Sequence, residues 1–128
     1  MIERITATGS FWDAPFSHAC RAGNFLFLTG QMPVDPSTGE YVENQIEPQT
    51  RRVLDNLLIV LDGAGMAPDD VVSARVFLTD MRDYDVFNRI YAEYMGRDLP
   101  ARTCIGVTGL AGGARVEVDF IAYNDSEG

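Results

Sequence analysis

The segment from residue 115 to residue 123 alternates between polar and apolar side chains, and this alternation constrains the fold more than any other feature of the sequence. Successive side chains of a strand point to opposite faces of a sheet, so the pattern predicts a strand with one buried face. The face predicted to be buried carries Val116, Val118 and Phe120. The opposite face carries Arg115, Glu117 and Asp119. A chain with such a strand needs apolar elements that cover one side of its sheet.

Two segments with the apolar period of a helix can provide that cover. The first is predicted to begin near Pro48, because proline is tolerated in the first helical turn, and to end at Gly63 and Gly65. The second is predicted to run from about Tyr84 to Met95. The side chains predicted to be buried are Val53, Leu54, Leu57, Leu58 and Leu61 in the first helix and Val86, Phe87, Ile90 and Tyr94 in the second.

Strand signals lie before, between and after these helices. The predicted strands are 2–6, 20–22, 25–29, 71–78, 102–107 and 115–123. In the fourth strand the alternation places Val72, Ala74, Val76 and Leu78 on one side. This order of elements predicts an α+β fold, a mixed sheet with both helices on one face. The chain has 128 residues, of which 46% are hydrophobic, so one domain over residues 1–128 is expected.

Composition excludes several function classes. The net charge of −9 disfavours a nucleic-acid partner, because an acidic surface repels phosphates. His18 is the only histidine and no Cys-x-x-Cys motif occurs, so no metal site is expected. No dinucleotide or phosphate-binding loop indicates a cofactor. No apolar run is long enough for a membrane span and no secretory pattern is present, so we expect a cytoplasmic protein with Cys20 and Cys104 as free thiols.

The last two strands carry the candidate site. If they form a hairpin that closes at 111–112, Gly106 lies opposite Glu117 and Cys104 lies opposite Asp119. The alternation of the first of these strands predicts that Thr103, Ile105 and Val107 face the helices. The other face of the sheet would carry Arg102, Cys104, Glu117 and Asp119. Two interpretations remain open. Either the Arg102 guanidinium binds a substrate carboxylate while Glu117 positions a water, or Arg102 forms an ion pair with a carboxylate of the neighbouring strand.

A series of short stretches matches one known family in order and in spacing. They are 14–19 (APFSHA), 22–31 (AGNFLFLTGQ), 35–39 (DPSTG), 49–50, 56–57, 76–81, 87–88, 91–92, 100–102 and 116–118. Through these residues the chain resembles the Rid family, the reactive intermediate deaminases that are also called YjgF-like proteins. The resemblance implies a chorismate-mutase-like α+β fold, a homotrimer whose sheets face inward, and clefts at the subunit interfaces.

The resemblance also implies an activity. Active members of the family are cofactor-independent hydrolases that convert enamines and imines of the 2-aminoacrylate type to 2-keto acids and ammonia. Carried over by position, the carboxylate-binding arginine is Arg102 and the water-associated glutamate is Glu117. The substrate-binding positions fall on Phe16, Thr29, Gly30, Asn88, Arg102 and Cys104.

Phe16 departs from the family pattern, because deaminase-active members usually have tyrosine at this position. The loss of that hydroxyl keeps two alternatives open. One is a non-catalytic protein that binds small carboxylates and acts as a regulator. The other is a deaminase of a larger unsaturated amino acid, such as an aminomuconate.

Overall fold

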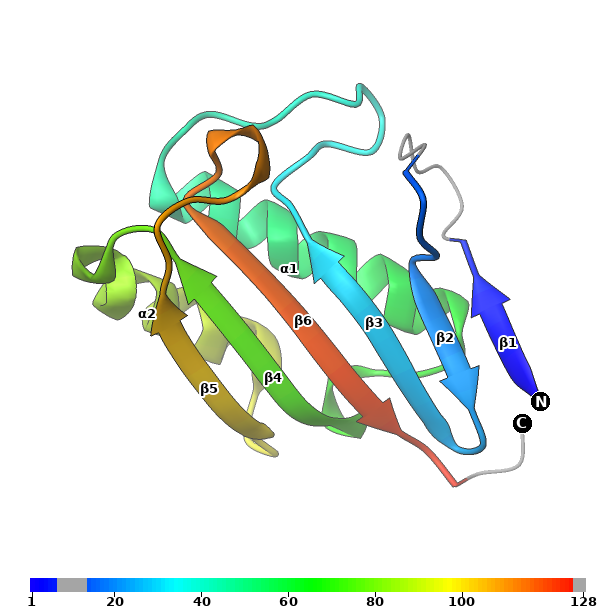
Figure 1. Ribbon diagram of the computed structural model, residues 1–128. Helices are drawn as coiled ribbons and strands as arrows, with labels where there is room; N and C mark the ends of the chain where they lie inside the picture. The colour runs from blue at the N-terminus through cyan, green and yellow to red at the C-terminus, as the bar shows by residue number, and fades with distance from the viewer. Residues whose placement is uncertain (7–13, 126–128) are drawn as a thin grey trace.

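The computed structural model describes residues 1–6 and 14–125, and these residues form one mixed sheet with two helices packed on one face (Figure 1). The strands lie in the order β1-β2-β3-β6-β4-β5. Their bounds are β1 Ile2–Ile5, β2 Ala19–Ala22, β3 Phe25–Gln31, β4 Val71–Leu78, β5 Ala101–Gly106 and β6 Val116–Tyr123. The helices are α1 Ile46–Gly63 and α2 Tyr84–Met95. The α+β class with both helices on one face is confirmed.

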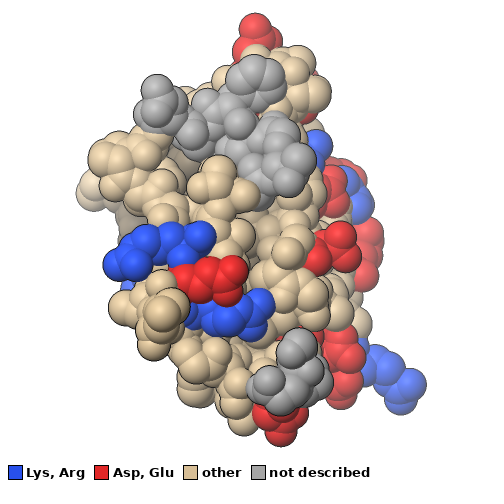
Figure 2. Space-filling model, turned by 90° about the vertical axis from the view of Figure 1, so that its right-hand side faces the viewer, with Lys and Arg blue, Asp and Glu red and all other residues tan. Residues whose placement is uncertain are grey.

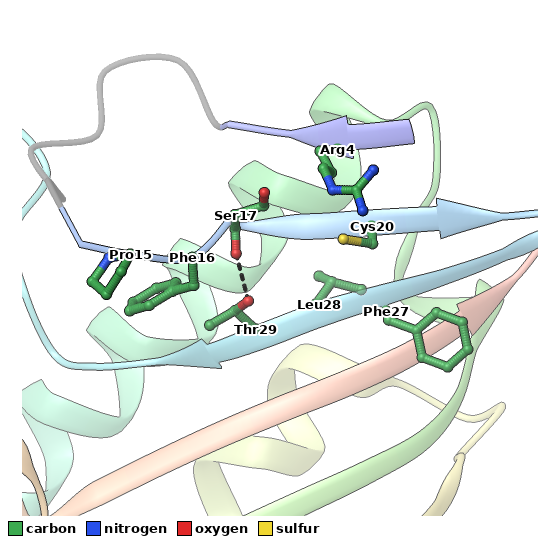
Figure 3. A pocket seen from close by; sticks show the side chains of 8 residues that line it. All are labelled: Arg4, Pro15, Phe16, Ser17, Cys20, Phe27, Leu28 and Thr29. Carbon is green, nitrogen blue, oxygen red and sulfur yellow. Dashed lines mark hydrogen bonds between the residues drawn. The ribbon is translucent and has the colours of Figure 1, made fainter. Parts of the chain in front are cut away.

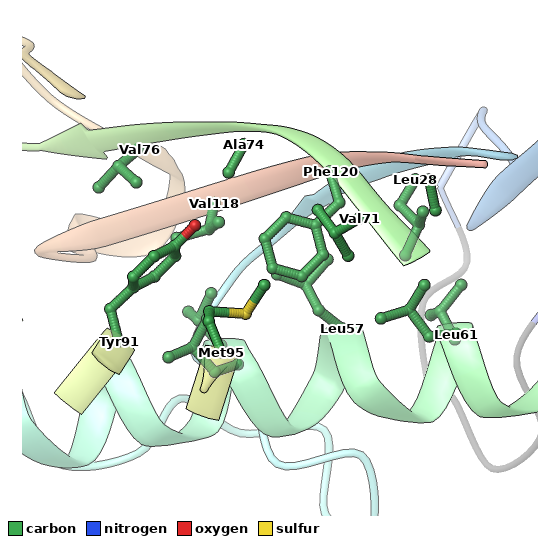
Figure 4. Packing of buried hydrophobic residues seen from close by; sticks show 14 of the residues in the cluster. Leu28, Leu57, Leu61, Val71, Ala74, Val76, Tyr91, Met95, Val118 and Phe120 are labelled. Atoms are coloured by element: carbon green, nitrogen blue, oxygen red, sulfur yellow. The ribbon is translucent and has the colours of Figure 1, made fainter. Parts of the chain in front are cut away.

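The core lies between the helices and the sheet (Figure 4). Leu57 and Leu61 of α1 point to Phe120 of β6 and Leu28 of β3, as the alternation of both strands requires. Each buried leucine contributes about 1.5–3 kcal/mol relative to an exposed one, so this layer supplies the main driving force for folding.

Some of the predicted core positions are wrong. Val72 is 43% exposed and Val71 is buried in its place, because the register between β4 and β6 shifts between Val71 and Ser73. In α2 the fully buried face is displaced, so that Tyr91 and Met95 are buried, whereas Tyr94 is only partly buried. Leu58 and Val86 are also only partly buried, and α1 begins at Ile46 rather than near Pro48.

The predicted hairpin between the last two strands is also wrong. β5 pairs in parallel with β4, and β6 lies between β3 and β4. The physical reason is the crossover: β4, α2 and β5 form a β-α-β unit, which returns β5 to lie parallel to the strand before the helix. Glu117 therefore lies beside Phe77 of β4, and Asp119 lies beside Arg75.

This pairing reverses the predicted orientation of β5. Arg102 is in register with Ala74, and Cys104 is in register with Val76, and both of these β4 residues face the helices. Arg102 and Cys104 thus lie on the helix face, while Ile105 lies on the open face and is 46% exposed. Glu117 lies on the open face, as predicted. Arg102 and Glu117 of one chain are therefore on opposite sides of the sheet.

Two buried amides fix the loops that border the open face. The Asn56 side chain of α1 donates to the carbonyl oxygens of Met32 and Val34 at 3.2 and 2.8 Å. The Gln49 side-chain oxygen accepts the backbone N–H of Arg115 at 2.8 Å, just before β6 begins. Both amides belong to stretches that carried the family resemblance, and the structure gives them a positioning role.

Candidate functional site

A cavity of about 270 Å³ opens on the sheet face away from the helices. It forms where the pairing of β3 with β6 is interrupted between Leu28 and Gln31, which leaves room beside Glu117. Its walls also include the turn at Ala111. The residues that line it are Phe16, His18, Thr29, Gly30, Gln31, Met32, Ala111 and Glu117.

Glu117 lies directly against the backbone of Gly30. A Cβ atom placed on Gly30 would come within 3.0 Å of the Glu117 Cδ and would overlap its Oε2. Any side chain at position 30 would displace the Glu117 carboxylate, so the position of Glu117 requires a glycine at residue 30.

Replacement of Gly30 by alanine is expected to displace the Glu117 carboxylate. The displaced atoms are the end of a flexible side chain, so the free energy of unfolding should change by only about 1 kcal/mol. Catalysis that depends on the placement of this carboxylate should fall by about tenfold to 100-fold. Gly63→Ala is the matched control, because nothing lies within 4 Å of its Cβ position. Unchanged kcat/KM in Gly30→Ala would contradict a catalytic role for Glu117.

The Glu117 carboxyl group has a raised pKa. Burial is the main cause, and the negative charge of Asp119 adds to it, whereas Arg75 acts in the opposite direction. The Arg75 guanidinium donates to the Asp119 carboxylate at 2.6 Å, so much of its charge is already neutralised. A carboxyl group with a raised pKa exchanges protons closer to neutral pH, which suits a general acid or base.

Tyr41 packs against the turn that supplies Ala111 to the cavity wall. Its hydroxyl donates to the Ala111 carbonyl oxygen at 3.2 Å, and its ring occupies the space that a Cβ on Gly112 would need. Burial raises the pKa of Tyr41, and the charge of Glu117 raises it further. No feature of the sequence identified Tyr41, because it comes from the loop between β3 and α1.

The aromatic and hydroxyl residues predicted for the site lie at the mouth of this cavity. The Thr29 hydroxyl donates to the Ser17 carbonyl oxygen at 2.6 Å, which leaves its oxygen as an acceptor (Figure 3). Phe16 is 54% exposed and lines the cavity with its ring. Phe16 brings no hydrogen-bonding group to a bound molecule.

Arg102 lies on the other side of the sheet, where α2 holds its side chain in place. One guanidinium nitrogen donates to the Asn88 side-chain oxygen at 2.7 Å. The guanidinium carbon lies 5.8, 5.5 and 4.9 Å from the ring centres of Tyr84, Phe87 and Tyr91. These cation–π contacts orient the planar guanidinium group and leave some of its N–H donors available. Tyr84, Asn88 and Tyr91 follow one another at helical spacing, which is the sequence signal that could have identified the two tyrosines.

Arg102 has no carboxylate partner among the residues that the structure describes. The cross-strand ion pair on the open face is formed instead by Arg75 and Asp119, with the shorter contact at 2.6 Å. The alternative that Arg102 pairs with Glu117 or Asp119 of its own chain is therefore wrong. Its guanidinium is partly buried, oriented, and available to a carboxylate from outside the chain.

Cys104 lies beside Arg102 and packs against the core. Burial raises the pKa of its thiol, and the nearby charge of Arg102 only partly opposes this effect. A thiol that stays protonated is a poor nucleophile, so Cys104 contributes shape rather than reactivity.

The predicted site residues thus form two half-sites on opposite faces of the sheet. The Glu117 half-site consists of Phe16, Thr29, Gly30 and Glu117. The Arg102 half-site consists of Asn88, Arg102 and Cys104. Within residues 1–6 and 14–125, no group of three or more His, Cys, Asp or Glu side chains could hold a metal ion. None of the helices described is long and apolar enough to cross a membrane.

Comparison with known proteins identifies the family. The family described as Endoribonuclease L-PSP matches residues 9–124. A RutC family protein of Pyrococcus horikoshii is 45% identical over 87% of this chain and 88% of its own. Reactive Intermediate Deaminase A, chloroplastic, of Arabidopsis thaliana is 36% identical over 84% of this chain and 58% of its own. The crystal structure of E. coli TdcF with bound serine matches with a TM-score of 0.88 at 28% identity, over 96% of this chain and 100% of that chain. The chain belongs to the family of reactive intermediate deaminases, or Rid proteins, whose relatives also carry the names RutC and L-PSP.

Proposed function

We propose that the protein is a cofactor-independent deaminase that hydrolyses small 2-imino and 2-enamino acids to 2-keto acids and ammonia. Its site is a cleft between subunits of a homotrimer, where the Glu117 half-site of one subunit meets the Arg102 half-site of the next. The observation that carries this proposal is an oriented arginine without a carboxylate partner on the face opposite to the glutamate.

The shared cleft follows from the position of the two half-sites. A substrate of a few atoms cannot contact both sides of one sheet, so Arg102 and Glu117 act together only if they come from different chains. β5 is one of the two edge strands, which places Arg102 near the rim of the sheet. A second copy that packs on the open face can therefore bring its own Arg102 to the Glu117 cavity.

The open face has the composition of a buried interface. Phe25 and Phe27 are 42% and 45% exposed, and Tyr123 packs against Phe25 in a tilted arrangement with ring centres 5.0 Å apart. Ile105 lies on the same face at the edge strand. An apolar sheet face of this kind favours association with other copies of the chain.

The chemistry assigns one task to each half-site. The Arg102 fork binds the substrate carboxylate through two parallel hydrogen bonds, which fixes the adjacent imine carbon. Glu117 accepts a proton from a water whose oxygen bonds to that carbon, and it passes the proton to the nitrogen. In the resulting carbinolamine, Glu117 takes the hydroxyl proton and delivers it to the amino nitrogen, the keto group forms as the carbon–nitrogen bond breaks, and ammonia leaves.

Two features favour imine hydrolysis over the RNA cleavage that the L-PSP description names. His18 is the only histidine, it is buried, and burial lowers its pKa, so it is poorly suited to pair with a second acid–base group on RNA. The net charge of −9 opposes the approach of a polyanion.

The proposal is tested by adding the protein to a threonine or serine dehydratase reaction and following 2-keto acid release. Release should be faster than spontaneous hydrolysis, and kcat/KM should fall as the pH is lowered through the raised pKa of Glu117, because the base must be ionised. Asp119→Asn removes one cause of the raised pKa, so it should shift this acid limb to lower pH.

Glu117→Gln should remove the acid limb together with most of the activity. No acceleration with several such imines would contradict the proposal. Phe16 supports the alternative of a non-catalytic protein that binds small carboxylates, because its ring brings no hydroxyl to the cavity. Thermal stabilisation by 2-keto acids without any turnover would then indicate a binding protein.

A further inference from the structure

A second cavity, of about 500 Å³, lies next to the Glu117 cavity on the open face. Phe16 and Thr29 line both cavities, so the two spaces are neighbours that share a wall. The second cavity extends from this wall across β2 to the edge strand β1 (Figure 3). A molecule held beside Glu117 can therefore extend into it.

The register of the strands explains why Arg4 belongs to this cavity. Arg4 of β1 is in register with Cys20 of β2, and Cys20 is in register with Phe27 of β3. Residues in register share a face, so these three side chains form a row on the open face. Figure 3 shows the Arg4 guanidinium above Cys20, at the end of the cavity that lies away from Phe16.

Among the residues that the structure describes, Arg4 is the only charged one that lines the second cavity. Among the described residues, no carboxylate lies within ion-pair distance of its guanidinium, and Glu3 pairs with Arg21 instead. Such a cation is unusual in a chain with a net charge of −9. Seen from the side of β1, two groups of basic side chains lie in the left and central part of the surface with one acidic side chain between them, whereas most of the acidic side chains lie at the right (Figure 2). The potential in this cavity therefore favours an anion.

We propose that Arg4 binds the distal carboxylate of the substrate, so that the preferred substrates are imines of dicarboxylic amino acids. This inference rests on the proposed deaminase function and names its substrate class. The first carboxylate is bound by Arg102 of the neighbouring subunit, and the reacting carbon lies beside Glu117. The substrate side chain passes Phe16 and Thr29 towards Arg4.

The distances along the sheet suit a substrate of that size. Neighbouring strands are about 4.8 Å apart and residues along a strand about 3.3 Å apart, so Cys20, above which the Arg4 guanidinium lies, is about 11 Å from Gly30, against which the Glu117 carboxylate lies. The contacts of the substrate with Arg4 and Glu117 take up part of this distance, and a side chain of two or three carbon atoms with a carboxylate fills the remainder. The exposed Phe27 side chain gives the passage an apolar floor that suits methylene groups.

The test compares two imines that an amino-acid oxidase forms in the assay, one from glutamate and one from 2-aminobutyrate. Wild-type protein should hydrolyse the dicarboxylic imine with the higher kcat/KM. Arg4→Gln should lower kcat/KM for that imine by about tenfold to 100-fold, the loss expected for one charge-assisted contact, and should leave the monocarboxylic imine within about twofold. Arg4→Lys should restore part of the preference. Arg89→Gln, on the outer side of α2, removes the same charge and should change neither value.

Equal effects of Arg4→Gln on both imines, or none on either, would overturn the inference. A failure of the proposed function itself is distinguishable, because wild-type protein would then accelerate neither imine. In that case thermal stability decides: 2-oxoglutarate should raise the Tm of wild-type protein more than that of Arg4→Gln, whereas 2-oxobutanoate should not distinguish the two. Equal shifts with 2-oxoglutarate would overturn the inference without reference to turnover.

Discussion

Arg102→Ala is expected to lower kcat/KM for 2-imino acid hydrolysis by about 10² to 10⁴-fold, because it removes two charge-assisted hydrogen bonds to the substrate carboxylate. The native partners of Arg102 are the Asn88 side chain and the rings of α2, none of which bears a charge that the substitution would leave unpaired. The free energy of unfolding should therefore fall by only about 1–2 kcal/mol. Steady-state kinetics and thermal unfolding measure these two quantities, and size-exclusion chromatography checks that the oligomer persists.

Two further variants separate charge from geometry. Arg102→Lys keeps the positive charge but not the planar fork, so its activity should lie between those of the wild-type protein and the alanine variant. Arg89→Ala removes an arginine from the outer side of α2, and its kcat/KM should equal that of the wild-type protein. If Arg102→Ala retained full activity while the oligomer persisted, the arginine would have no role in binding the carboxylate.

The sequence predicted the elements with one clear buried face. The alternation of β6 correctly placed Glu117 on the open face, because the apolar residues of this strand belong to the core between the sheet and the helices. The same reasoning was wrong for β5, where Ile105 is exposed and Cys104 packs inward. An edge strand has little core to cover, so its apolar side chains follow the requirements of the open face instead of those of the helices.

Strand pairing was not predictable from local pattern. A hairpin between neighbouring strands is the simplest interpretation of 102–107 and 115–123, but α2 returns β5 to the far side of β4. The register shifts in β3 and β4 left no mark in the alternation either. The first of these shifts opens the space beside Glu117, so the cavity was not visible in the sequence.

The family resemblance named the candidate site residues one by one and implied clefts between subunits, but the strand pattern wrongly placed Arg102 and Glu117 on one face of the sheet. Family resemblance named Glu117 and Gly30, and the structure brings them into contact. It also named Asn88 and Arg102, and the structure joins them by a hydrogen bond of 2.7 Å. Only the three-dimensional register shows that these two pairs lie on opposite faces, and this finding leads to a cleft shared between subunits.

Subunit mixing is expected to restore activity from two inactive proteins. Arg102→Ala lacks the carboxylate anchor at every site, and Glu117→Gln lacks the base at every site, so trimers of either variant alone should be inactive. In a cyclic trimer that contains both variants, one interface joins the intact Arg102 of one chain to the intact Glu117 of the next. Each mixed trimer should therefore carry about one functional site of three.

The experiment co-expresses the two variants with different affinity tags and purifies the trimers that carry both tags. A shared cleft predicts about one third of the wild-type kcat per trimer with unchanged KM. The inactive control is a trimer in which every chain is Arg102→Ala and both tags are present. If Arg102 and Glu117 acted within one chain, every chain of the mixed trimer would be defective. Mixed trimers as inactive as that control would contradict the central claim of a site shared between subunits.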